Sequence, residues 1–330
     1  MVQIRAAGVA LYEGAFNLLE RPMLALQRVL GQHRLAWVFL LPNLLIFGLF
    51  TFVPIILNFA FATTSGDRII IGDRPYVGAA NFASLLDCES YLNPNTCRRD
   101  LFWRAVHNTG WFVVLQVGFM VLFSLITALI LNRDIVLRGF FRAVFFYPVL
   151  LSPVVVALIW KWILQRNGVL NAGLDWAGFG TVNWLLEANW AFFWIVFVSI
   201  WANMGFYVLI LLAGLQSIPG DVYEAAEMDG TPRWRQLLRI TLPLLMPTML
   251  VVLVLSLIRA VQAFDEIYVL TGGGPGSATT LLIQYIYDVG FATRPRVYGL
   301  AAAASLMMAG VLFVLTMAQL AATRKRGEDG

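Results

Sequence analysis

Six long apolar stretches dominate this chain of 330 residues and leave it few ways to fold. They cover residues 35–62, 107–131, 143–164, 190–215, 241–264 and 297–322. Each is close to the ~20 residues that an α-helix needs to cross a bilayer. In hydrocarbon the backbone must satisfy its own hydrogen bonds, which a helix does and an open strand does not. The sequence therefore predicts an all-α, polytopic membrane protein with six transmembrane helices.

The composition supports this class. Hydrophobic residues make up 60% of the chain and charged residues 13%, with a mean hydropathy of +0.76. A soluble domain carries about 25% charged residues, so this chain lacks the polar surface that covers a globule in water. The pI of about 9.2 comes from arginines in short loops rather than from a basic face, so we expect lipid and not nucleic acid around the protein.

Arginine collects in the loops that follow the second and fourth apolar stretches. These loops carry Arg133, Arg138 and Arg142, and Arg233, Arg235 and Arg239. Because basic loops stay on the cytoplasmic side, we predict a bacterial inner membrane protein with both termini cytoplasmic. Residues 1–34 are then a cytoplasmic segment, either an interfacial amphipathic helix or an irregular tail, and residues 323–330 a cytoplasmic tail.

The first outer loop of this topology contains both cysteines, Cys88 and Cys97. Two readings stand: a local disulfide in an oxidising compartment, or two free thiols. The two histidines, His33 and His107, form no cluster with metal-ligand spacing, and we expect no metal site. Pro54, Pro148, Pro153 and Pro247 predict kinks in their helices.

A polar segment at 221–243, DVYEAAEMDGTPRWRQLLRITLP, interrupts the apolar pattern between the fourth and fifth stretches. Asp221 and Glu224 have the spacing of a capping box, and Gly230 is a natural helix stop. Thr231 and Pro232 then predict the start of a second helix that leads into the membrane.

Such a short helix has two readings. An ordinary amphipathic loop helix accounts for the caps and the arginines. A docking helix also accounts for Glu224, a carboxylate for a partner's arginine, and for Ala225 and Ala226, whose small side chains let another backbone approach. We favour docking.

Longer motifs extend this reading. Glu224-Ala225-Ala226, Asp229-Gly230 and Ile240-x-Leu242-Pro243 resemble the EAA loop of binding-protein-dependent ABC importer permeases. Leu215-Gln216-Ser217-Ile218-Pro219 and Gly272-Gly273-Gly274-Pro275 resemble the carbohydrate-uptake branch of that family, nearest to the first membrane subunit of maltose- and glycerol-phosphate-type importers.

The resemblance implies the type I ABC importer permease fold, with a permease domain at 35–322 and a coupling helix at about 221–239. It implies that this chain pairs with a second permease subunit as a heterodimer. Two copies of a cytoplasmic ATPase subunit would bind ATP and Mg, and an extracytoplasmic solute-binding protein would deliver a carbohydrate. The residues implied to dock on the ATPase are Glu224, Ala225, Ala226, Asp229 and Gly230. The chain itself has no GxxxxGK[ST] phosphate loop, so we expect a non-catalytic subunit without a cofactor.

Polar groups inside the predicted spans mark the substrate path, because such groups usually face a cavity or each other. The candidates are Asn203, Gly205, Tyr207, Arg259, Gln262, Asp265, Glu266 and Tyr268. We expect Gly205 to admit a sugar ring close to the backbone, and Tyr207, Phe264 and Tyr268 to stack on it. The alternative is structural: Asp265 and Glu266 end the fifth helix in water or pair with Arg259, and Gln262 faces another helix.

We therefore predict that this chain is a permease subunit of an ATP-driven, binding-protein-dependent sugar importer. A permease for a phosphorylated or charged solute such as a glycerol phosphate is the first alternative, with Arg259 as counter-charge. A secondary transporter is the second, but the chain shows no internal repeat. A membrane enzyme is the third, and no paired carboxylates or His/Cys pair in a span support it.

Overall fold

The computed structural model describes Gln27, Gly31, Leu35 and residues 37–328, with side chains as far as Ala321. The predicted N-terminal helix or tail at 1–34 lies almost entirely outside the described residues. Two units, 1–60 and 61–330, are described separately. Throughout the described residues the secondary structure is helical, with isolated bridges in place of strands, as the prediction of an all-α fold requires.

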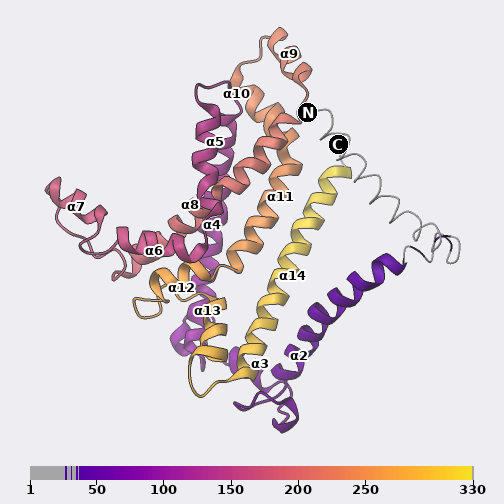
Figure 1. Ribbon diagram of the computed structural model, residues 1–330, viewed down its shortest axis with the longest axis vertical. Coiled ribbons are helices and arrows are strands. Elements are labelled where there is room, and N and C mark those ends of the chain that lie inside the picture. The colour runs from indigo at the N-terminus through magenta and orange to yellow at the C-terminus, as the bar shows by residue number, and fades with distance from the viewer. Residues whose placement is uncertain (1–26, 28–30, 32–34, 36, 329–330) are drawn as a thin grey trace, which may run out of the picture. The chain divides into compact units, whose positions relative to one another are not determined.

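The helices of the spans match the apolar stretches closely. Four helices long and apolar enough to cross a membrane are Trp37–Ala62, Asp100–Leu131, Ala188–Gln216 and Tyr298–Ala321, and a fifth, Arg233–Val261, begins within the polar segment. In Figure 1 they contain α2 (Val53–Ala62), α4 (Asp100–Leu131), α8 (Ala188–Gln216), α10 (Arg233–Gln236) with α11 (Leu242–Val261), and α14 (Tyr298–Glu328). A π-turn, η1 (Gly48–Phe52), precedes α2, and another, η5 (Leu237–Thr241), joins α10 to α11. Pro247 lies inside the continuous helix α11.

The segment at 143–164, predicted to be one span, does not form one continuous helix. The chain forms α5 (Arg138–Phe146) and the 3₁₀-turn η4 (Tyr147–Leu150), then turns by 103° into α6 (Pro153–Ile163). Pro153 explains the turn, because the residue before a proline avoids the helical conformation. That residue, Ser152, is extended at φ −61° and ψ 136°. The described residues thus hold five candidate spans, or six if the bent pair counts as one.

The predicted fifth span, 241–264, also ends differently. Its helix stops at Val261, and Phe264 at φ −142° separates it from a new helix, α12 (Asp265–Thr271). Asp265 and Glu266 were predicted to lie in the fifth span or to end its helix, and both predictions are wrong. Both acids occupy the first turn of α12, where negative charge favours the positive end of the helix dipole.

Shorter helices complete the 61–330 unit. They are η2 (Ile71–Asp73), α3 (Ala80–Leu86), η3 (Pro94–Thr96), α7 (Val169–Trp176), α9 (Gly220–Met228), α13 (Leu282–Tyr287) and η6 (Asp288–Ala292). α9 lies at one end of this unit, and α3 and α13 lie at the other (Figure 1). We call these the α9 end and the α13 end.

The core of this unit forms where α4, α8 and α11 pack on one another. Fully buried side chains such as Phe112, Ile195, Leu211 and Leu245 fill the space between these helices. A second cluster around Phe102 joins the start of α4 to α13 and α14. At this end the backbone N–H of Leu282 donates to the Thr109 hydroxyl at 2.8 Å, which ties α13 to α4.

The loop between α3 and α4 contains both cysteines, which form a disulfide in the structure. An isolated antiparallel bridge pairs the same two residues. The loop packs on the first turn of α4, where the Tyr91 ring lies 4.9 Å from the Trp103 ring and the Trp103 indole donates to the Leu85 carbonyl. Of the two readings of the cysteines, the structure has the disulfide.

Gly205 has a packing role that the sequence did not suggest. A Cβ atom at this position would lie 2.2 Å from the Phe145 carbonyl oxygen and 2.8 Å from the Phe146 Cα. The open side of the glycine is therefore filled by the backbone of α5, which packs directly on α8. The expectation that Gly205 admits a sugar ring is wrong in this structure, because protein atoms occupy that space.

We predict that Gly205→Ala destabilises the protein by about 1–3 kcal/mol, the usual cost of forcing an extra group into a packed interior. The melting temperature of the purified protein in detergent measures this. Gly118→Ala in α4 is the matched control, because a Cβ there meets nothing within 4 Å and alanine favours a helix over glycine by roughly 1 kcal/mol. Equal melting temperatures for the two variants would contradict the close α5–α8 contact.

Candidate functional site

The short helix α9 is ended by a local hydrogen-bond motif. The Thr231 N–H donates to the Ala226 carbonyl and the Gly230 N–H to the Glu227 carbonyl, both at 2.9 Å, with Gly230 at φ +68°. This is a Schellman motif, which requires a left-handed residue and so favours glycine. The predicted stop at Gly230 agrees with this geometry.

The start of α9 differs from the sequence prediction. The N-cap is Pro219 rather than Asp221, and no side chain caps the helix, so the predicted capping box does not form. The N-cap of α10 is likewise Pro232, without a cap from Thr231. In both cases a proline held in the extended conformation starts the helix (ψ 137° and 149°).

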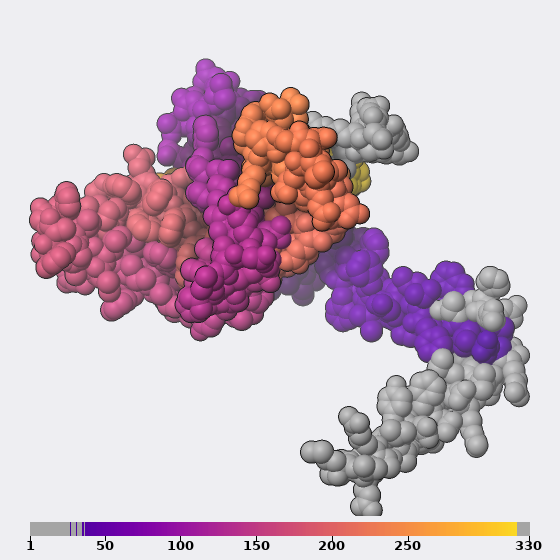
Figure 2. All heavy atoms as spheres, turned by 90° about the horizontal axis from the view of Figure 1, so that it is seen from above, coloured from indigo at the N-terminus to yellow at the C-terminus, as the bar shows by residue number. Residues whose placement is uncertain are grey.

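One face of α9 is open to its surroundings. Glu224 and Ala225 are exposed, Asp229 and Gly230 are exposed at its end, and Met228 keeps 89% of its surface accessible. Ala226, by contrast, is buried within the chain, so only one of the two alanines is available to a partner. Figure 2 looks onto this end of the molecule, where the α9–α10 segment (orange) stands at the surface. The sequence reading missed Met228, although Val222, Ala225 and Met228 recur at helical spacing.

A side-chain hydrogen bond joins α9 to the fifth span, and a second bond holds the turn between α9 and α10. The Tyr223 and Thr241 hydroxyls form a hydrogen bond at 3.0 Å, and the Gln236 amide donates to the Thr231 carbonyl at 3.0 Å. Gln236 and Thr241 are themselves buried. The Tyr223–Thr241 bond therefore connects α9 to the start of the long helix that continues to Val261.

Deeper in the unit, the two helix breaks enclose a cavity of about 260 Å³. Three predicted substrate-path residues line it: Asn203 from α8, Arg259 from α11 and Glu266 from α12. The rest of the wall comes from η4, α6 and α8. Those lining residues are Pro148, Val149, Leu151, Pro153, Val156 and Ala202.

The polar wall of this cavity is held by few hydrogen bonds. The Ser199 hydroxyl donates to Glu266 Oε1 at 3.4 Å, and the Asn203 amide donates to the Ser199 carbonyl at 2.9 Å. Glu266 is buried, whereas Arg259 is exposed. Among the described ion pairs none joins Arg259 to Glu266 or Asp265, which leaves the Arg259 guanidinium available to a solute.

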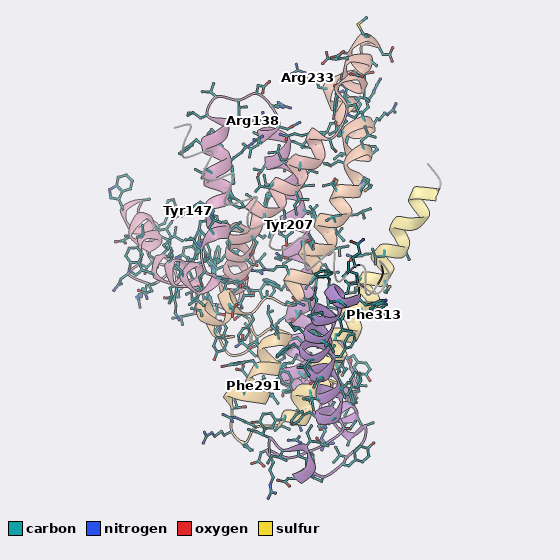
Figure 3. All side chains as sticks on the ribbon, turned by 45° about the vertical axis from the view of Figure 1, so that its right-hand side comes forward. Arg138, Tyr147, Tyr207, Arg233, Phe291 and Phe313 are labelled. Carbon is teal, nitrogen blue, oxygen red and sulfur yellow. A yellow bond between two sulfur atoms is a disulfide. The ribbon has the colours of Figure 1, made fainter. Side chains whose placement is uncertain are left out.

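The other candidates lie elsewhere. Tyr207 is 3% exposed and sits in the middle of the helices in Figure 3, so the expectation that its ring stacks on a sugar does not hold in this structure. Gln262 and Asp265 are exposed outside the cavity. Tyr268 stacks on Phe264 with ring centres 5.1 Å apart.

The sequence reading did not single out Ser199 or the wall at 148–156 as cavity residues. The prolines were predicted only as kinks, yet their bend places this segment against α8 and α12. No cluster of three or more metal-binding side chains occurs in the described part of the chain.

The comparisons with known proteins agree with these features. Residues 120–327 match the family model described as binding-protein-dependent transport system inner membrane component. The trehalose/maltose transport system permease protein of Thermococcus litoralis is 34% identical over 299 residues, which cover 89% of this chain and 95% of the relative. The lactose transport system permease protein of Rhizobium radiobacter is 31% identical, over 88% of this chain and 94% of the relative.

A solved structure has the same fold. It is a crystal structure of a bacterial ABC transporter involved in the import of the acidic polysaccharide alginate, with a TM-score of 0.77 and 27% identity. The match covers 91% of this chain and 99% of the other. These findings bear out the predicted family and fold class. The chain belongs to the inner membrane components of binding-protein-dependent transport systems, as a non-catalytic, multi-pass permease subunit of a sugar ABC importer.

Proposed function

We propose that this permease subunit couples sugar import to ATP hydrolysis through α9, which docks into a cytoplasmic ATPase subunit. The observation that carries the proposal is the exposed face of Glu224, Ala225 and Met228 on a helix that is hydrogen-bonded to the fifth span. An exposed apolar stripe beside a carboxylate suits a partner with a small apolar cleft and an arginine. Asp229 and Gly230 shape the turn that fixes the helix direction.

The proposed assembly has four further chains. A second permease subunit forms the other half of the path, two ATPase subunits hold ATP and Mg, and a solute-binding protein delivers the sugar from outside. A solved complex of the alginate transporter with a pentasaccharide-bound periplasmic protein is similar to this chain over 91% of its length, with a TM-score of 0.75, which supports this arrangement. In this proposal the protein lies in a bacterial inner membrane, with the α9 end and both chain termini on the cytoplasmic side. The disulfide lies on the outer side.

In this assembly the cavity at the helix breaks is the substrate site of this subunit. Its volume of about 260 Å³ is just below the ~300–1,000 Å³ of typical ligand pockets, which suits part of a sugar chain held between two subunits. Asn203 and Glu266 would hydrogen-bond sugar hydroxyls. We favour a carbohydrate as the solute because this chain is similar to the trehalose/maltose and lactose permeases along almost their whole length.

Charge reversal on α9 tests the docking. We predict that Glu224→Lys weakens ATPase binding by on the order of thirtyfold, because removing one partner of a buried charge pair costs about 2 kcal/mol or more. Co-purification of the ATPase and ATP-dependent uptake in proteoliposomes are the measurements. Asp175→Lys, an equal charge change on the exposed α7 helix, is the control. If Glu224→Lys retains normal ATPase binding and uptake, α9 is not the docking helix.

Substitutions of two neighbouring acids, Glu266 and Asp265, test whether the cavity binds the transported sugar. We predict that Glu266→Gln raises the KM for the transported sugar about tenfold, since a charge-assisted hydrogen bond contributes ~1.5–3 kcal/mol, whereas Asp265→Asn leaves it unchanged because Asp265 lies outside the cavity. Uptake kinetics of both variants, with the intact complex confirmed by size-exclusion chromatography, give the comparison. Equal effects of the two substitutions would remove the cavity from the path.

Arg259 favours a second candidate, import of an anionic sugar or a phosphorylated solute such as a glycerol phosphate. Its guanidinium lines the cavity without an ion pair to the nearby described acids, and the transporter of similar structure carries an acidic polysaccharide. If the solute is anionic, Arg259→Met should abolish its uptake; if it is neutral, uptake should persist. Uptake of neutral and uronic-acid oligosaccharides by the wild type and the variant separates the two candidates.

A further inference from the structure

Six aromatic rings form a continuous row from the start of α12 toward the α13 end. Phe264 and Tyr268 lie 5.1 and 5.5 Å from Tyr287, which lies 6.1 Å from Phe291. The row continues from Phe291 to Tyr298 at 6.3 Å and from Tyr298 to Phe61 at 6.1 Å. We call these residues the aromatic row. They come from α12, α13, η6, α14 and α2, so only the folded chain brings them together.

The inner end of the row lies at the start of α12, the helix that supplies Glu266 to the cavity wall; Phe264 and Tyr268 themselves do not line the cavity. Phe264 and Tyr268 stand on either side of Glu266 in the sequence, and their rings stack with planes inclined by only 22°. At the outer end the Arg74 guanidinium lies over the Phe61 and Tyr298 rings, 5.0 and 5.8 Å from their centres. The row therefore runs from α12, which borders the candidate substrate site through Glu266, to the Arg74 guanidinium at its outer end.

The middle of the row is exposed, and its surroundings are polar. Phe291 keeps 60% and Tyr287 38% of their surface accessible. Asp288 lies between these two residues, and the exposed Arg294 follows them. Because charged side chains are costly in hydrocarbon, this segment belongs in water, in an aqueous cavity or at the membrane–water interface. Its exposed rings therefore do not lie in the hydrocarbon core of the bilayer.

The chemistry of these side chains matches one class of ligand. In the described residues no hydrogen bond is made by the hydroxyl groups of Tyr268 and Tyr287, so both are free to bind another molecule. A pyranose ring has an apolar C–H face that packs on an aromatic ring and an edge of hydroxyls that needs hydrogen-bond partners. Rings at regular spacing with unpaired hydroxyls provide both.

We propose that the aromatic row is an oligosaccharide track, which guides a sugar chain of several units from the outer side into the cavity. This inference rests on the proposed sugar import. It adds that the substrate is a chain of several sugar units, because a single sugar would occupy only one or two rings. Hydrocarbon covering the same rings would leave the two tyrosine hydroxyls and the nearby charges without water or ligand.

Cysteine labelling tests the track directly. The chain has two cysteines, and both are in the disulfide, so Phe291→Cys introduces the one reactive thiol into this subunit. In the assembled complex, with the other subunits made cysteine-free, we expect Phe291→Cys to react with a membrane-impermeant maleimide added outside. Phe313→Cys is the control. Phe313, labelled in Figure 3, belongs to the apolar helix α14 and is 62% exposed, so it should face lipid and stay unlabelled.

Two outcomes of the labelling overturn the proposal. One is no reaction at Phe291→Cys, which would mean that a partner subunit or lipid covers the row. The other is reaction without protection by a sugar that the complex transports; the probes are maltose with maltohexaose, and alginate oligosaccharides. Protection that is several-fold stronger for the longer sugar supports it. If the complex transports no sugar, the proposed function fails while ATPase docking through Glu224 remains measurable.

Uptake kinetics give a second readout. We expect Phe291→Ala and Tyr287→Ala to raise the KM for the longest transported oligosaccharide several-fold with little change in kcat, and to affect the shortest one less. Phe291→Trp, which keeps a stacking face, should restore the wild-type KM. A loss that is equal for long and short sugars, or that Trp does not reverse, would show a structural role in place of a track.

Discussion

A membrane-spanning backbone has no water to receive its hydrogen bonds, so every break in a helix must be sheltered by protein or must line a cavity. The described residues contain two such breaks in or beside the candidate spans, at Ser152 between η4 and α6 and at 262–264 between α11 and α12. Residues that flank both breaks line the same cavity, which also holds Asn203. The candidate substrate site is thus located where the helical pattern fails, and the polar side chains at the breaks are available to a solute.

The fifth span connects the candidate substrate site to the α9 end. The fifth span runs from Arg233 to Val261, with α9 hydrogen-bonded near its beginning and Arg259 near its end. If α9 docks on an ATPase subunit as proposed, its displacement would move one wall of the cavity against α8, because a helix transmits force along its axis. The close contact at Gly205 holds α5 to α8, so the walls respond as packed units.

Residue patterns alone predicted much of this protein. The all-α fold, five of the six apolar segments and the glycine stop after α9 followed from bilayer thickness and backbone chemistry. The failures have physical reasons. Proline at 153 produced a turn of 103° where a kink was expected, because sequence shows that a helix is interrupted but not the angle at which it resumes. Gly205 and Tyr207 were assigned to the path, since polar or small residues in a span do not reveal which neighbour they face.

The sequence by itself determined the class, because apolar length and motif order depend on local residues alone: a multi-pass permease of the binding-protein-dependent family. Only the tertiary structure decided which side chains meet. Arg259 and Glu266 share a cavity without an ion pair, and rings from Phe61 to Tyr298 form one row, because helix breaks and packing angles set those distances. Contacts between residues far apart in the chain depend on all the packing between them, and no local pattern records it.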